Sequence, residues 1–192
     1  MRRIRIVVSY DGTNYCGWQI QPNGITIEEI LNRQISKLTG EDIRIIGASR
    51  TDSGVHALGN VAVFDTESRI PGDRFAYALN QKMPEDIVIV RSDEVQIDWH
   101  PRYQNEISKT YEYHIYNAKV RNPLKNRYST FVSFDLDVEK MRQGAKYILG
   151  EHDFASFCNV RTNAKDTVRT VHEITIKEIP MDKFRASNWG WE

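Results

Sequence analysis

The sequence has 192 residues, with 26 basic and 26 acidic side chains that balance to a net charge of zero. This length allows one large domain or two small ones, each with a hydrophobic core, whereas the charge balance excludes a uniformly basic nucleic-acid-binding protein. Cys16 and Cys158 are far apart, the histidines lack ligand spacing, and neither a secretory signal nor a membrane-spanning run is present. We therefore expect a cytoplasmic protein with reduced thiols, no metal and no membrane segment.

The first two elements predicted along the chain are a strand and a helix. Residues 3–10 alternate basic or polar side chains with apolar ones, which is the period of a strand with one buried face. Residues 26–39 place their apolar side chains on one stripe of a helix. Thr26 and Glu29 form a capping box at the start of this helix, and Gly40 follows as a stop signal.

Four further elements complete the first half of the chain. Residues 43–48 and 60–66 predict two consecutive strands. Residues 71–83 predict a helix closed by Pro84, and residues 87–91 predict a buried strand. The resulting order, βαββαβ, is that of the ferredoxin-like unit, whose antiparallel sheet has both helices on one face. The other face of such a sheet is free to receive another molecule.

The second half predicts a shorter set of elements. Residues 110–117 alternate in the manner of a strand, and residues 168–179 predict another. Between them, residues 137–150 predict a helix with Asp137 as its N-cap and Gly150 as its stop. This β, α, β order is an incomplete repeat of the first half, and together the two halves predict an α+β protein.

The connection between the predicted strands 43–48 and 60–66 has side chains suited to chemistry. A carboxylate such as Asp52, with the cation Arg50 two residues away, should be ionised at neutral pH and can then act as a nucleophile or general base. The same residues also fit a plain turn, because Asp bonds its own backbone and Gly54 accepts a positive φ. On these residues alone the plain turn is the better interpretation.

Two groups of basic residues are suited to a polyanion. They are Lys119, Arg121, Lys125 and Arg127, in an extended loop without acids, and Arg161, Lys165 and Arg169. Such residues can contact phosphates, but they also occur in ordinary solvated loops. Tyr111 and Tyr113 offer rings on which bases can stack, although alternating tyrosines in a strand often belong to a core.

Short segments spread over most of the chain resemble TruA-type tRNA pseudouridine synthases and follow the order seen in that family. The main segments are Tyr10-Asp11-Gly12-Thr13, Gly17-Trp18-Gln19, residues 50–57 (Arg-Thr-Asp-Ser-Gly-Val-His-Ala), Met83-Pro84-Glu85-Asp86-Ile87, His100-Pro101-Arg102, Lys109-Thr110-Tyr111-Glu112-Tyr113, Gly150-Glu151-His152-Asp153-Phe154 and Thr167-Val168-Arg169-Thr170. The resemblance implies a pseudouridine synthase fold of two ferredoxin-like (RRM-like) units with a mixed, largely antiparallel sheet. It places a complete domain over residues 1–105 and a truncated one over residues 106–192.

The resemblance also implies roles for individual residues. Asp52 corresponds to the catalytic aspartate, Arg50 to the arginine that displaces the target base, and Tyr111 to the tyrosine that packs on the flipped uracil. His56 belongs to the motif without an assigned step. The implied reaction isomerises uridines of the tRNA anticodon stem-loop, around positions 38 to 40, without a cofactor, and the enzyme is a homodimer. The basic loop at residues 119–127 is then a candidate for phosphate contacts by its charge.

The sequence departs from the family in its last part. The family's C-terminal segment, a Gly-Phe-Leu run followed by Met-Val-Arg, is absent, and its arginine normally pairs with the catalytic aspartate. Arg185 is the nearest arginine in order, and Asn60 stands where a glutamine is usual. Two functions therefore stay open: a tRNA pseudouridine synthase and a shortened, inactive tRNA-binding module of the same ancestry. An RRM-like binder is disfavoured, since the aromatic signature of that domain is lacking.

Overall fold

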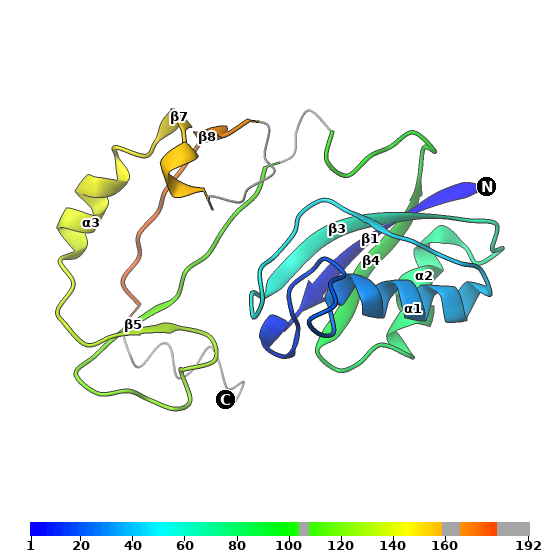
Figure 1. Cartoon of the computed structure of the whole chain (residues 1–192), viewed down its shortest axis with the longest axis horizontal. Coiled ribbons are helices and arrows are strands. Elements are labelled where there is room, and N and C mark those ends of the chain that lie inside the picture. The colour runs from blue at the N-terminus through cyan, green and yellow to red at the C-terminus, as the bar shows by residue number, and fades with distance from the viewer. Residues whose placement is uncertain (104–107, 159–165, 180–192) are drawn as a thin grey trace. The chain divides into compact units, whose positions relative to one another are not determined.

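The computed structural model describes residues 1–103, 108–158 and 166–179. The chain divides into two compact units, Met1–Glu112 and Tyr113–Glu192, and each is described by itself. Helices and antiparallel strands form the first unit, whereas the second has shorter elements (Figure 1). The α+β class predicted from the sequence is therefore confirmed.

A four-stranded antiparallel sheet forms the centre of the first unit. Its strands are β1 (Arg2–Tyr10), β2 (Ile46–Gly47), β3 (Ala57–Thr66) and β4 (Ile87–Val95), in the spatial order β2-β3-β1-β4. β1 pairs with β3 on one side and with β4 on the other, so that Ile6 lies opposite both Ala62 and Ser92. The strand predicted for residues 3–10 is confirmed as the inner strand β1.

Helix α1 (Ile27–Thr39) begins and ends where the sequence predicts. The Thr26 hydroxyl accepts a hydrogen bond from the Glu29 amide at 3.3 Å, which satisfies one of the free N–H groups at the helix start. Gly40 closes the helix in the left-handed region at φ +77°, a conformation that favours glycine. The buried stripe of the helix consists of Ile27, Ile30, Leu31 and Ile35.

The core of this unit lies between the sheet and its helices. Alternate residues of β1, namely Ile4, Ile6 and Val8, are fully buried against α1 and α2 (Phe75–Asn80). Each large apolar side chain buried in this way contributes about 1.5–3 kcal/mol. On the other face of the sheet, two cross-strand ion pairs, Arg3 with Asp65 and Arg5 with Asp93, each use two N–H groups on two oxygens.

The strand predicted for residues 43–48 is longer than the strand observed. Only Ile46–Gly47 forms ladder pairs with β3. The amides of Ile43 and Ile45 instead donate to side chains of α1, at 3.0 Å to Ser36 Oγ and 2.9 Å to Asn32 Oδ1. Both isoleucines are buried, so the apolar pattern reflects packing on the helix rather than a strand.

The next helix and strand also differ in length from their predictions. Residues 71–83 form a 3-10 turn, Gly72–Arg74, followed by the short helix α2. The helix ends at Asn80, whose side-chain amide bonds both the N–H and the C=O of Ile89. β4 continues to Val95, beyond the predicted end at residue 91, because its residues keep their pairing with β1.

The second unit has two small sheets and one helix. The elements are β5 (Ile115–Asn117) parallel to β6 (Thr130–Val132), α3 (Val138–Ala145), the 3-10 turn Ala155–Phe157, and β7 (Gly150–Asp153) antiparallel to β8 (Val168–Val171). The predicted N-cap of α3 is confirmed, because the Asp137 carboxylate accepts from the Lys140 amide at 3.0 Å. β6 was not predicted from the sequence.

Three predicted elements of the second half are shorter in the structure. Residues 110–114 are not a strand, and β5 begins only at Ile115. α3 ends at Ala145 rather than near residue 149, because the following amides bond carbonyls three residues back. β8 ends at Val171 instead of continuing to residue 179. A sequence that alternates apolar and polar residues forms a strand only where a neighbouring strand pairs with it and one of its faces is buried.

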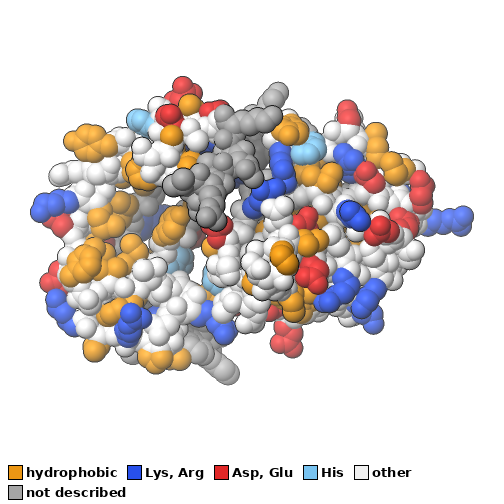
Figure 2. All heavy atoms as spheres, in the orientation of Figure 1, with side chains coloured by type: hydrophobic (Ala, Val, Ile, Leu, Met, Phe, Trp, Pro, Cys, Tyr) orange, Lys and Arg blue, Asp and Glu red, His pale blue; other side chains and the backbone are white. Residues whose placement is uncertain are grey.

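The described residues of the second unit lack a buried core. None of residues 113–158 and 166–179 falls in the buried class, whereas the first unit has a continuous apolar cluster. Apolar side chains of this unit therefore lie at its surface (Figure 2), among them Phe134, Tyr147 and Phe157. Among the described residues, no helix is long and apolar enough to cross a membrane.

This difference in burial predicts unequal protection of the two units. Amides in the middle of α1 should exchange with solvent at least about a hundredfold more slowly than those of α3, because exchange from a helix without buried contacts needs little opening free energy. Hydrogen exchange read by mass spectrometry on the intact chain measures both helices together. Equal protection of α1 and α3 would contradict this account.

Candidate active site

The loop that carries Asp52 connects β2 to β3. The Ala48 amide still donates to the Val61 carbonyl at 2.7 Å, and the chain then leaves the sheet until β3 begins at Ala57. Along residues 49–52 the side chains alternate between half-buried and exposed, and both Arg50 and Asp52 are exposed. The two residues that the family resemblance singles out therefore face solvent together.

The segment from Tyr10 to Trp18 holds this loop from one side. The Trp18 amide donates to the Thr51 carbonyl at 3.0 Å. The carbonyl of Tyr15 accepts twice, from the Gly54 amide at 3.3 Å and from the Ser53 hydroxyl at 3.2 Å. These bonds fix the backbone on both sides of Asp52, although its own carboxylate makes no hydrogen bond or ion pair within the described residues.

Two glycines let these backbones approach each other closely. A Cβ on Gly12 would lie 2.0 Å from the Val55 carbonyl oxygen, and a Cβ on Gly17 would lie 2.5 Å from that of Thr51. Gly17 also has φ +80°, a conformation that other residues rarely adopt. The segments Asp11-Gly12 and Gly17-Trp18 therefore have a physical role, which is to let the Asp52 loop pack directly on backbone.

The holding segment is itself tied to the rest of the first unit. The carbonyls of Gly17 and Trp18 accept from the amides of Ile27 and Glu28 at the start of α1. The Tyr15 hydroxyl donates to Asp86 Oδ1 at 2.5 Å, just before β4. Burial, together with this bond to the carboxylate, raises the pKa of Tyr15 well above its usual range, so the hydroxyl stays protonated as a donor.

His56 closes the far end of the loop. Its Nδ1 lies 3.1 Å from the Gly12 amide nitrogen and 3.0 Å from Asp11 Oδ1. An unprotonated Nδ1 accepts from Gly12, whereas a protonated one donates to the Asp11 carboxylate. In either state the imidazole joins the loop to the turn after β1, which gives this histidine a structural explanation.

Arg102 is a further residue at this loop for which the sequence suggested no role. Its Nε donates to the Gly47 carbonyl at 2.8 Å, at the end of β2 where the loop begins. The motif His100-Pro101-Arg102 marked the position, but the spacing in the sequence gave no indication that it returns to residue 47. The exposed guanidinium adds a second cation beside the segment that contains Arg50.

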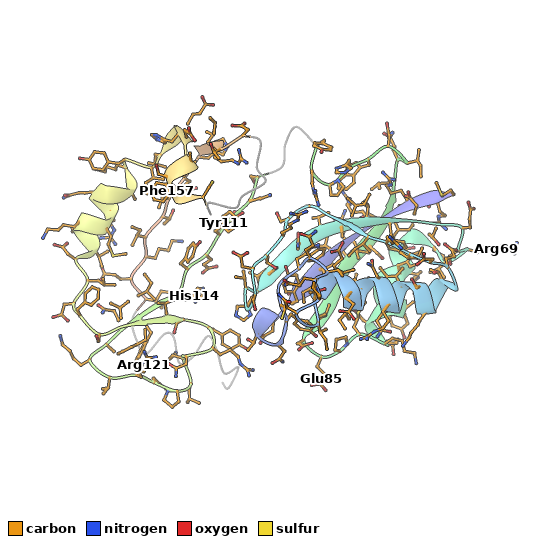
Figure 3. All side chains as sticks on the ribbon, in the orientation of Figure 1. Arg69, Glu85, Tyr111, His114, Arg121 and Phe157 are labelled. Carbon is orange, nitrogen blue, oxygen red and sulfur yellow. The ribbon has the colours of Figure 1, made fainter. Side chains whose placement is uncertain are left out.

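Tyr111 is found on the segment that leads into β5 (Figure 3). Its side chain is 74% exposed, and the described residues provide it with neither a ring contact nor a hydrogen bond to the Asp52 loop. The structure therefore brings Arg50 and Asp52 onto one surface but shows no contact between them and Tyr111. The role of Tyr111 stays a prediction.

The basic loop of the second unit lies between β5 and β6, with Arg121 marked in Figure 3. Lys119 pairs with Asp135 at 2.8 Å, and the Arg121 guanidinium lies 4.9 Å from the centre of the Phe131 ring. Lys125 is half-buried and Arg127 is exposed. Arg161, Lys165 and Arg185 lie outside the described residues, while Arg169 is on β8, within 4.0 Å of Asp166.

A search of residues 1–103, 108–158 and 166–179 finds no group of three or more His, Cys, Asp or Glu side chains that could hold a metal ion. The arrangement around Asp52 is an exposed carboxylate on a backbone that is hydrogen-bonded on both sides, in a loop that also carries the exposed Arg50. Such a site can supply a nucleophile to an anionic ligand.

Comparison with known proteins identifies the family. The family model described as "tRNA pseudouridine synthase" matches residues 6–104 and 145–187. "tRNA pseudouridine synthase A" of Acetivibrio thermocellus is 47% identical over 192 residues, which is 100% of this chain and 78% of that protein. "tRNA pseudouridine synthase A" of Thermoanaerobacter sp. is 45% identical over 178 residues, covering 93% of this chain and 72% of the relative. "tRNA pseudouridine synthase A 2" of Clostridium perfringens is 48% identical over 177 residues, covering 92% and 72%. On these matches, this chain belongs to the tRNA pseudouridine synthase family.

Proposed function

We propose that this protein isomerises uridine to pseudouridine in the anticodon stem-loop of tRNA, around positions 38 to 40. The observation that carries the proposal is the Asp52 loop: an exposed carboxylate on a backbone that the Tyr10–Trp18 segment fixes from one side. Its relatives, at 45–48% identity, are named tRNA pseudouridine synthase A or A 2. These names and the exposed Asp52 carboxylate support the proposed isomerisation.

The reaction breaks one bond to C1′ and forms another, and it needs no redox partner. The N1–C1′ glycosidic bond of uridine breaks, a C5–C1′ bond forms, the hydrogen of C5 leaves to solvent, and N1 takes up a proton. The Asp52 carboxylate attacks the nucleotide at its sugar or its ring, which allows the base to detach, rotate and rejoin through carbon, and the bond to Asp52 breaks again as the product forms. Arg50 takes the place of the base in the stack, and Tyr111 packs on the flipped uracil. No cofactor takes part in this proposal.

We also propose a specific fold within the α+β class. We propose that both halves are ferredoxin-like units, one over residues 1–105 and the other over residues 106–192. The first of these units is supported by its sequence of elements, βαββαβ, and by the spatial order of its strands, β2-β3-β1-β4. The family resemblance supports a cytoplasmic homodimer whose subunits share one tRNA.

We also propose that Lys119, Arg121, Lys125 and Arg127 contact the RNA backbone. Arg127→Ala should weaken tRNA binding equally for all sequences and lower the slope of log affinity against log salt by about 1, because one phosphate contact is lost. Lys146→Ala removes an exposed cation of the same unit from outside the loop and serves as the matched control. Fluorescence anisotropy at several salt concentrations measures both variants. An equal slope for the wild type and Arg127→Ala would contradict the assignment.

A second function is favoured by one observation, the lack of buried residues among the described part of the second unit. A unit without a core can bind RNA by charge and still fail to close over a flipped base. In that case the chain is a tRNA-binding module without turnover.

Nucleoside analysis distinguishes the two functions. Anticodon stem-loop RNA is incubated with the chain, alongside the same RNA with cytidine at the target positions. Pseudouridine in the first RNA alone supports the isomerase. Bound RNA that keeps all its uridine supports the binding module, and a chain extended with the remaining length of the Acetivibrio thermocellus relative then tests whether that length restores turnover.

A further inference from the structure

The side chains of Tyr10 and Asn60 lie beneath the Asp52 loop, and the Tyr10 hydroxyl contacts both Asn60 and Thr51 of the loop. The Tyr10 hydroxyl lies 2.9 Å from Thr51 Oγ1 and 3.4 Å from Asn60 Nδ2. Asn60 Nδ2 also donates to the Ser49 carbonyl at 3.0 Å. Tyr10 is 4% exposed and Asn60 is 9% exposed. We call Tyr10, Thr51 and Asn60 the Tyr10 cluster.

The Tyr10 cluster decides which side chains of the loop face solvent. It holds Ser49 by its carbonyl and Thr51 by its hydroxyl on the inner side. Because the side chains of this segment alternate, Arg50 and Asp52 are left on the outer side, and both are exposed. The motif Arg-Thr-Asp therefore has an anchor in its middle residue.

Asp52 depends on this anchor because its own carboxylate makes no hydrogen bond or ion pair within the described residues. Its position is set by its backbone, and Thr51 is held twice, through its hydroxyl by Tyr10 and through its carbonyl by the Trp18 amide. Reacting groups must be placed to within about 0.5 Å for full activity. An enzyme whose reactive loop is displaced by about 1 Å loses on the order of a hundredfold in rate.

The cluster is built to persist at neutral pH. Burial is the main cause that raises the pKa of Tyr10, while its bonds to Thr51 and Asn60 act in the opposite direction. The hydroxyl therefore stays protonated and can donate to one partner while it accepts from the other. The Tyr10 ring lies 6.0 Å from the Trp18 ring in the core, so a phenylalanine can keep the packing while it removes the hydroxyl.

We propose that Tyr10, Thr51 and Asn60 are positioning residues of the uridine isomerisation, which hold Asp52 and Arg50 outward in the reactive arrangement. This inference rests on the proposed function for its effect on turnover. Asn60 contributes an amide nitrogen that reaches both the Tyr10 hydroxyl and the Ser49 carbonyl.

The test compares variants that keep shape but differ in the hydroxyl. Tyr10→Phe and Thr51→Val should lower kcat by about 10- to 100-fold while the KM for anticodon stem-loop RNA changes by less than about threefold. Thr51→Ser keeps the oxygen and should retain kcat within about threefold of the wild type. Ser92→Ala removes a buried acceptor of the Ala76 amide in the same unit, so it should lower the melting temperature without changing kcat.

Hydrogen exchange of the Trp18 amide, which donates to Thr51, supplies a readout that needs no turnover. We expect this amide to exchange about fivefold faster or more in Thr51→Val and Tyr10→Phe, and at the wild-type rate in Thr51→Ser and Ser92→Ala. Wild-type kcat in Tyr10→Phe and Thr51→Val, or a loss of kcat in Ser92→Ala equal to theirs, would overturn the proposal. If the wild type forms no pseudouridine, the proposed function fails, and the Trp18 amide alone decides whether the cluster holds the loop.

Discussion

Asp52→Asn is expected to reduce pseudouridine formation at least about a thousandfold, because an amide of the same shape cannot act as the nucleophile. The same change should leave stability and tRNA affinity close to those of the wild type. Asp52 is exposed and its carboxylate makes no hydrogen bond or ion pair within the described residues, so the fold loses no contact when the charge is removed.

Initial rates on anticodon stem-loop RNA, thermal melting and RNA binding are measured for Asp52→Asn and for the control Asp42→Asn. Asp42 is an exposed carboxylate before β2, outside the loop, and its replacement should leave all three quantities unchanged. Full activity in Asp52→Asn would remove Asp52 from the mechanism. A large fall in melting temperature would assign it to the fold instead.

Gly17→Ala is expected to lower both the melting temperature and kcat. Gly17 has φ +80°, and a Cβ there would lie 2.5 Å from the Thr51 carbonyl oxygen and 3.1 Å from the Asp52 carbonyl carbon. Both neighbours are backbone atoms, so the Asp52 loop itself must move. We expect at least about a hundredfold loss of kcat, in line with a displacement of about 1 Å.

Gly40→Ala provides the matched control for this change. Gly40 has nearly the same backbone conformation, φ +77°, but a Cβ there would meet nothing within 4 Å. Both variants therefore carry the cost of about 1–2 kcal/mol for a left-handed residue, and only Gly17→Ala adds the collision with the loop. Equal losses of kcat and of melting temperature in the two variants would contradict the role given to Gly17.

Much of the first unit could be predicted because local patterns and long-range packing agree there. The alternation in residues 3–10 and the caps Thr26 and Gly40 correspond to β1 and α1 as observed. The strand predicted for residues 43–48 was too long because the amides of Ile43 and Ile45 bond side chains of α1, and a residue pattern does not reveal such partners.

The second unit was less predictable for a different reason. A period of two implies a strand only when another strand and a buried face are present, and residues 110–114 have neither among the described residues. Tyr111 and Tyr113 are accordingly exposed outside any strand. The division into domains at residues 105 and 106 stays a prediction.

Sequence patterns alone were also insufficient to predict the candidate site. Asp52 and Arg50 were found from a resemblance of motifs, since the residues alone favoured a plain turn. The contacts that hold them, from Tyr10, Gly17, Trp18 and Arg102, join positions 33 to 55 residues apart in the sequence. No spacing rule links such positions, so the motifs could be listed by sequence but explained only by the fold.

The most direct test of the central claim is the release of hydrogen from C5 of uridine, because pseudouridine forms only when that carbon exchanges its hydrogen for the bond to C1′. Anticodon stem-loop RNA labelled with tritium at C5 of its uridines is incubated with the wild-type chain. We predict tritium release to water in step with pseudouridine formation, and background release with Asp52→Asn. RNA that binds the wild-type chain but retains its tritium, or equal release by both chains, would contradict the account.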